Sequence, residues 1–136
     1  MGAKANSTGT RMRNKQPMLV LTGRRKKRRY IVEVGGVEVS LTGSLFRPLC
    51  ELAAARLAKA GPVSLSRLYV HRLRRALQQA VRRAGIEDSL IHAVSKGKYV
   101  LGVSPGRIVV EESFREVVLT GCVGSACAKI LLEHIR

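Results

Sequence analysis

Acidic residues are scarce in this sequence: nine Asp and Glu stand against 25 Lys and Arg among 136 residues. The formal net charge at pH 7 is therefore +16. Such an excess of one sign destabilises a compact chain by self-repulsion unless a polyanion lies nearby. We expect nucleic acid as the partner, with an anionic membrane surface as the second choice.

Long apolar runs are absent, and aromatic side chains are few. No run reaches the roughly 18 apolar residues of a membrane-spanning helix, and the basic N-terminus lacks the apolar core of a secretory signal. Three Tyr, two Phe and no Trp are too few rings for a single-strand binder that stacks bases on aromatic side chains. We expect a cytoplasmic, nucleoid-associated protein without membrane contact.

Cysteine occurs only as Cys50, Cys122 and Cys127, an odd count without a CxxC pair. This pattern gives poor support to a zinc site or to a disulfide framework. Cys122 and Cys127 could form a disulfide in an oxidising compartment. Buried thiols in a reduced cytoplasm are the interpretation that we favour.

Catalytic constellations are missing as well. Catalysis would need a nucleophile with its base, a carboxylate pair or a metal cluster. His71, His92 and His134 have no metal-ligand spacing among themselves. The carboxylates at 87–88 and 111–112 are neighbours in sequence, so their side chains diverge on a strand or sit at a helix end. We expect no enzyme, no cofactor and no metal.

The stretch from 67 to 84 is the most informative part of what is present. At about 100° per residue on a helix, Val70, Leu73, Leu77, Ala80 and Ala84 fall on one face. The opposite face holds His71, Arg75, Gln78 and Arg82, with Arg67 and Arg74 beside them and no carboxylate. A helix exposed only for solubility usually mixes acids and bases at i,i+4. Because Arg and Gln can read guanine and adenine edges, we interpret residues 66–84 as a DNA recognition helix; a solvated cationic surface is the alternative.

A small sheet and two basic segments are expected before this helix. Residues 1–16 are basic without periodicity and predict a flexible arm, or a terminus with no specific role. Runs at 18–21, 30–34 and 37–41 predict an antiparallel sheet. Between the first two runs stand six consecutive cations: Arg24, Arg25, Lys26, Lys27, Arg28 and Arg29. We expect them at a hairpin tip or strand edge that grips phosphates, or as a localisation signal if the host is eukaryotic.

A core helix is expected between the sheet and the basic helix. Thr42 or Ser44 can cap it, and it should run to about residue 60, before Gly61-Pro62. Pro48 is tolerated if Ser44 is the cap and is costly if Thr42 is. The predicted core face consists of Leu45, Leu49, Leu52, Ala53, Leu57 and Ala60.

A β-hairpin is expected after the basic helix. Runs at 90–94 and 99–103 are joined by a short turn around Gly97, which presents Lys96 and Lys98. Residues 104–136 add a strand at 107–112 and a helix at about 125–135. This apolar tail should either complete the core or form a homodimer contact. A basic helix followed by a basic hairpin is typical of a winged helix.

The chain resembles the OmpR/PhoB-type winged helix, the DNA-binding effector domain of bacterial response regulators. The similarity covers about residues 30–103. The residues that carry it are Leu41, Thr42, Phe46, Leu49, Val70, the run from Leu73 to Leu77, Val94 and Tyr99. The resemblance implies an N-terminal antiparallel sheet, three helices and a hairpin wing. It also implies that His71, Arg72, Arg74 and Arg75 contact bases and phosphates, and that Tyr99 packs.

Several departures from the family pattern are visible. Leu45 stands where the family usually has an acidic residue. Few residues separate Gly61-Pro62 from the basic helix, so the second helix should be truncated or absent. The usual basic positions of the wing hold Ser95 and Val100, for which Lys96 and Lys98 could substitute. The segment before the domain is also too short for a phospho-receiver domain, so regulation by aspartyl phosphorylation is not implied.

The sequence therefore predicts an α+β fold: a winged helix-turn-helix domain at 17–103 after the arm, followed by the 104–136 extension. Its predicted function is to bind double-stranded DNA as a stand-alone transcriptional regulator. Arg72, Arg75 and Gln78 should read base edges, while Arg67, Arg74, Arg82, Lys96 and Lys98 should hold phosphates. A ribosome-associated RNA-binding protein and a non-specific architectural binder remain the alternatives.

Overall fold

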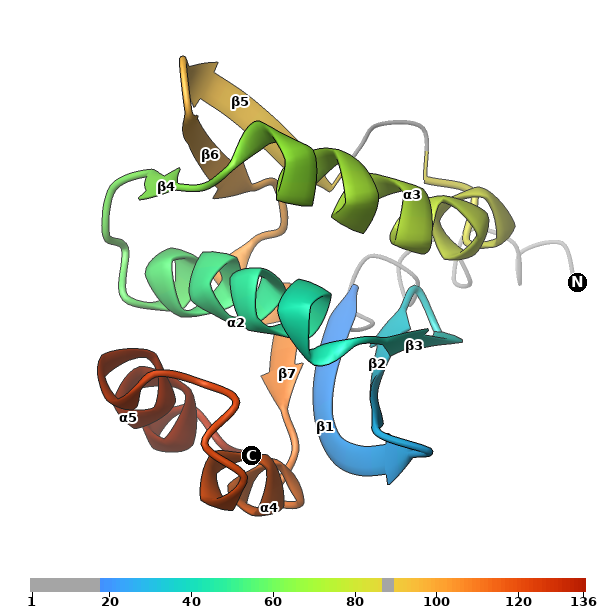
Figure 1. Cartoon of the computed structure of the whole chain (residues 1–136), viewed down its shortest axis with the longest axis vertical. Helices are drawn as coiled ribbons and strands as arrows, with labels where there is room; N and C mark the ends of the chain where they lie inside the picture. Colours follow the sequence, from blue (N-terminus) through green and yellow to red (C-terminus); the bar gives the residue numbers. More distant parts are fainter. Residues whose placement is uncertain (1–17, 87–89) are drawn as a thin grey trace, which may run out of the picture.

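The computed structural model describes residues 18–86 and 90–136 (Figure 1). The expected arm at 1–16 and the acidic pair at 87–88 lie outside the described residues. Within the described ranges, helices and two small sheets share one apolar core, which confirms the α+β class. No helix in these ranges combines the length and the apolar character needed to cross a membrane.

The first sheet is a meander joined by a strand from the far end of the chain. Strands β1 (Leu19–Lys26), β2 (Arg29–Val34) and β3 (Val37–Leu41) pair in antiparallel fashion. Strand β7 (Ile108–Val110) pairs with β1 in parallel, so the order is β3-β2-β1-β7. The predicted antiparallel pairing of the three N-terminal strands is confirmed. The parallel addition of β7 was not predicted, because periodicity within a segment carries no information about a partner so distant in sequence.

Helix α2 (Gly43–Leu57) begins directly after Thr42 and carries Pro48 in its interior. The cap position is thus the one that makes this proline unfavourable, because Pro48 has no N–H for the carbonyl of Ser44. The helix also ends earlier than residue 60, and Lys59 turns away with a φ of 56°. Ala60, which was expected in the core, is consequently exposed, whereas Phe46 and Leu49 are fully buried.

Helix α3 (Arg67–Arg83) confirms the amphipathic pattern. Its buried residues are Val70, Leu73, Leu77 and Ala80. The apolar face packs against α2, β2 and β3, and the polar face is left in solvent. Gly35 leaves room for the end of this helix, because a Cβ there would stand 2.3 Å from the Cβ of Ala84.

The second sheet consists of β4 (Val63–Ser64), β5 (Ile91–Ser95) and β6 (Lys98–Leu101), in the order β4-β6-β5. Strands β5 and β6 form the expected hairpin. Only Leu65 and Ser66 stand between β4 and α3, and no helix occurs there. The connection from α2 to α3 therefore lacks the additional helix of a helix-turn-helix, as the shortness of this segment indicated.

The C-terminal segment packs on the core. After a 3-10 turn η1 (Pro105–Arg107) and β7, it forms α4 (Phe114–Leu119) and α5 (Ser125–Glu133). Buried residues of this segment include Ile108, Val110, Phe114, Val117 and Leu131. Helix α4, which the sequence did not predict, reaches β1 at Gly23, where a Cβ would stand 1.6 Å from the carbonyl oxygen of Ser113. Helix α5 packs on α2.

Candidate nucleic-acid interface

A ridge of polar side chains follows the solvent side of α3. His71, Arg75, Gln78 and Arg82 are all exposed on it. No hydrogen bond or ion pair joins the side chain of any of them to another residue in the described ranges. The sequence from 52 to 86 contains no Asp or Glu, so neither α3 nor the end of α2 offers them a carboxylate. The ridge thus presents positive charge that the helix itself does not neutralise.

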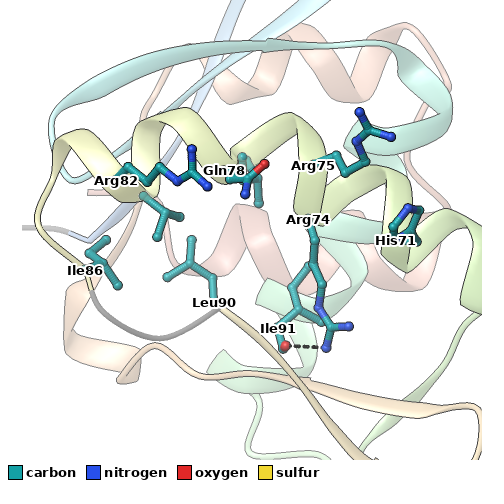
Figure 2. Close-up of a pocket in the computed structure, with 10 residues that line it drawn as sticks. His71, Arg74, Arg75, Gln78, Arg82, Ile86, Leu90 and Ile91 are labelled. Atoms are coloured by element: carbon teal, nitrogen blue, oxygen red, sulfur yellow. Dashed lines mark hydrogen bonds between the residues drawn. The ribbon is translucent and has the colours of Figure 1, made fainter.

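Arg74 has a different role from its neighbours on α3. Its Nη2 donates a hydrogen bond of 2.7 Å to the carbonyl oxygen of Ile91 on β5 (Figure 2). Its guanidinium carbon also lies 6.0 Å from the ring centroid of Tyr99 on β6. This hydrogen bond ties the β5–β6 hairpin to α3. The phosphate contact expected of Arg74 stays a prediction.

The hairpin and α3 border a common groove. The space has a volume of about 460 Å³, and the residues that line it are Arg67, His71, Arg74, Ala93, Ser95, Lys96, Gly97 and Tyr99. Gly97, with a φ of 73°, allows the tight turn that brings Lys96 to the rim. Tyr99 is 6% exposed and supports the groove from below, in keeping with a packing role. None of these lining residues is acidic.

A second hollow continues along α3 toward its C-terminal end. Its volume is about 350 Å³, and Figure 2 shows Arg82 and Gln78 over it with Ile86 and Leu90 on the opposite side. Arg75 and His71 also line it, and no described lining residue is a carboxylate. The side chains that were predicted to act together at the ridge therefore border two adjoining hollows. Arg72 is exposed on α3 but lines neither of them.

Exposed apolar residues at the same end were missed. Leu68 and Tyr69, in the first turn of α3, are 54% and 42% exposed, and Val94 on β5 is 57% exposed. Helical periodicity could have identified Leu68, because it falls away from the face defined by Val70 and Leu73. Apolar side chains at such positions can contact sugars or thymine methyl groups.

The six cations at 24–29 lie elsewhere. They form the end of β1, the start of β2 and the turn between them, as the hairpin-tip interpretation predicted. Arg24 forms ion pairs of 2.8 Å with Glu33 and 2.9 Å with Glu38, and the guanidinium carbon of Arg25 lies 5.2 Å from the Tyr30 ring centroid. In Figure 1 this turn is at the opposite end of the molecule from α3 and the β5–β6 hairpin. The structure therefore does not bring the two basic clusters together.

The three cysteines are free thiols near the α2–α5 contact. Burial, together with the nearby Glu51 carboxylate, raises the pKa of Cys127 to about 12. Burial also raises the pKa of Cys50 well above its ordinary value. Cys122 is half-buried, with its Sγ 3.8 Å from the carbonyl oxygen of Gly43. Cys50 is fully buried and Cys127 packs against the core, so both side chains contribute to packing.

No family model, curated protein or solved structure matches this chain. The similarity to the OmpR/PhoB-type domain therefore stays a prediction from the residues. The chemistry of the α3 end has to be inferred from its own geometry and charge.

Proposed function

We propose that this protein binds double-stranded DNA through α3 and the β5–β6 hairpin and acts as a transcriptional regulator. The observation that carries the proposal is the groove between these two elements. It is bordered by Arg67, His71 and Arg74 from the helix and by Lys96 from the hairpin, and no lining residue is acidic. A surface of this kind leaves its positive charge for an external polyanion.

The exposed side of α3 is suited to a major groove. The groove of B-DNA is wide enough to admit an α-helix, and Arg and Gln make bidentate contacts with guanine and adenine there. Arg75 and Gln78 face the solvent on one side of α3 and are our first candidates for base contacts. Arg72 is a third, on a neighbouring part of the helix surface.

The hairpin is suited to the DNA backbone. Winged-helix proteins place a recognition helix in the major groove while a neighbouring β-hairpin contacts phosphates or the minor groove. Lys96 and Lys98 are exposed at the turn of this hairpin, and Arg67 and Arg82 are exposed along α3. We assign phosphate contacts to these four side chains. Arg74 acts mainly by holding the hairpin at a fixed position relative to the helix.

The support of α3 differs from that implied by the resemblance. Because no helix stands between β4 and α3, the helix rests on α2 and on the first sheet, through β2 and β3. The apolar face of α3 is closely packed on this support, since Leu73 and Leu77 are at most 2% exposed. The approach angle of α3 to DNA is then set by α2 and the first sheet rather than by a helix-turn-helix partner.

Selection of bound duplexes from a random library tests the proposal. A regulator should enrich one palindromic or repeated motif, and competition with structured RNA should displace that motif poorly. Absence of enrichment would indicate an architectural binder instead. Equal or stronger binding of structured RNA would support the ribosome-associated alternative and would contradict the proposal.

A further inference from the structure

The turn between β1 and β2 presents four adjacent cations at its tip. Lys26 ends β1, Lys27 and Arg28 form the turn, and Arg29 begins β2. All four are exposed, and no ion pair joins any of them to a residue in the described ranges. Glu33 and Glu38, on the same sheet, are instead occupied by Arg24. The tip is therefore an unneutralised cluster of positive charge.

The backbone of this turn is unfavourable for the residues that it contains. Lys27 and Arg28 have φ angles of 51° and 69°. Two-residue hairpin turns with both φ angles positive strongly prefer Asn-Gly or Gly-Gly, because side chains with a Cβ are disfavoured there. The same chain uses Gly35 and Gly36 in its next hairpin turn, with φ angles of 56° and 84°. The lysine and arginine at the first turn are thus a local cost to stability.

The strand positions beside the turn add a second cost. Lys26 and Arg29 are directly paired across β1 and β2. Like charges in directly opposite positions destabilise a hairpin. The four cations therefore destabilise the hairpin in two ways at the same place. Because they do not stabilise the fold, we infer that these residues serve an interaction outside it.

The position of the tip decides what it can reach. In Figure 1, α3 and the β5–β6 hairpin lie in the upper half of the molecule and the β1–β2 turn in the lower half. Helix α3 packs on α2 and the first sheet with its apolar face, so its polar ridge points away from the body of the molecule that carries the tip. A straight duplex held on α3 therefore passes away from the β1–β2 turn.

We propose that the β1–β2 tip is a second phosphate-binding surface, with which one molecule bound to DNA through α3 holds a second duplex. The inference rests on the proposed function of α3. Lys and Arg at a turn that contains no Asn or Gln bind phosphates independently of sequence. The tip should thus bridge duplexes of any sequence, whereas α3 selects the first one.

A bridging assay on the full chain tests this. One duplex with the selected motif is fixed to beads, and the capture of a second, labelled duplex of unrelated sequence is measured. Affinity for the first duplex alone is measured separately by fluorescence anisotropy. The variant is Lys26→Thr/Lys27→Asn/Arg28→Gly/Arg29→Thr, which removes the four charges and supplies the residues that the turn and the strand pair favour. It should therefore fold at least as well as the parent chain.

The matched control removes the same charge elsewhere. Lys59→Gln/Arg115→Gln/Lys129→Gln/Arg136→Gln takes four positive charges from scattered, exposed positions. We expect the tip variant to lose capture of the second duplex by about tenfold or more, with the control changed far less, because only the tip concentrates phosphate contacts. Affinity for the single fixed duplex should be similar in both variants.

Three results would overturn the inference. If the tip variant still bridges two duplexes, bridging is due to another surface or to a dimer of the protein. Light scattering would detect such a dimer. The tip variant could instead lose bridging and affinity for the single fixed duplex to the same extent, while the control loses neither. That result would show that the tip contacts the same duplex as α3. If the parent chain binds no duplex at all, the proposed function itself is wrong. This failure is distinguishable from failure of the bridging inference, because it is seen with the parent chain before any variant is compared.

Discussion

The two ends of this molecule carry similar charge on different architecture. At the α3 end, cations share a helix with Gln78, border grooves and are positioned by a buried face and by the bond from Arg74 to Ile91. At the β1–β2 end, Lys26 to Arg29 are exposed at a turn, with no Asn or Gln among them. Charge alone attracts any polyanion, whereas charge fixed beside hydrogen-bonding groups can select among sequences. The comparison separates a surface suited to recognition from one suited to attachment.

Both ends of the molecule are built on one core, and Gly23→Ala tests this. Of the predicted changes, we expect this substitution to have the largest effect, on the free energy of unfolding. A Cβ at Gly23 would meet the backbone of Ser113, whose Oγ accepts the Gly23 N–H at 2.9 Å. Because both contacting segments are backbone, they cannot easily move apart. We expect the free energy of unfolding to fall by about 3 kcal/mol or more. Urea unfolding followed by circular dichroism measures the change.

Gly61→Ala is the matched control for this substitution. A Cβ at Gly61 has nothing within 4 Å, so its stability should be nearly unchanged. One cooperative transition in both variants would agree with a shared core. A Gly23→Ala protein that is as stable as the control would contradict the close packing of α4 against β1.

Arg75→Ala tests recognition at the α3 end. If Arg75 reads a base, its loss should weaken binding to the selected duplex by about 1–3 kcal/mol and relax the preference at one position. Arg83→Ala removes the same charge from the same helix, at a position that lines neither hollow. Binding curves for matched and mismatched duplexes measure both terms. If the two variants lose equal affinity and no specificity, Arg75 contributes charge only, and the α3 end resembles the tip.

Features of the two ends that depend on interactions between residues close in sequence were predicted, whereas features that depend on contacts between distant segments were not. The amphipathic pattern of α3 and the turn residues of the β1–β2 and β5–β6 hairpins are local, so their placement was predicted correctly. The parallel pairing of β7 with β1 and the short helix α4 depend on contacts between distant segments. The predicted ridge residues were exposed as expected, but the bond from Arg74 to Ile91 depends on where β5 packs. The separation of the two basic clusters has the same origin, because no local pattern places one surface relative to another.

Arg74→Lys tests whether the α3 end depends on position as well as charge. Lysine keeps the charge but lacks the planar guanidinium that bonds to Ile91 and lies near Tyr99. We expect a loss of stability of about 0.5–1.5 kcal/mol and a comparable loss of DNA affinity, through a less fixed hairpin. Arg83→Lys is the control, since the Arg83 side chain has no partner among the described residues and lines neither hollow. Equal affinities for the two variants would show that the position of the hairpin does not matter for binding.

The smallest effect that we predict concerns the turn of the β1–β2 hairpin. Lys27→Asn/Arg28→Gly should raise the free energy of unfolding by up to about 1 kcal/mol, because both positions have positive φ and like charges are removed. The control, Lys26→Asn/Arg29→Gly, makes the same chemical changes at paired strand positions. Because Gly and Asn are unfavourable in strands, this pair should lower the free energy of unfolding. Opposite signs in urea unfolding would locate the cost in the backbone of the turn. If both pairs stabilise equally, the cost is charge repulsion alone, and the geometry of the turn gives no reason to regard its cations as selected for binding.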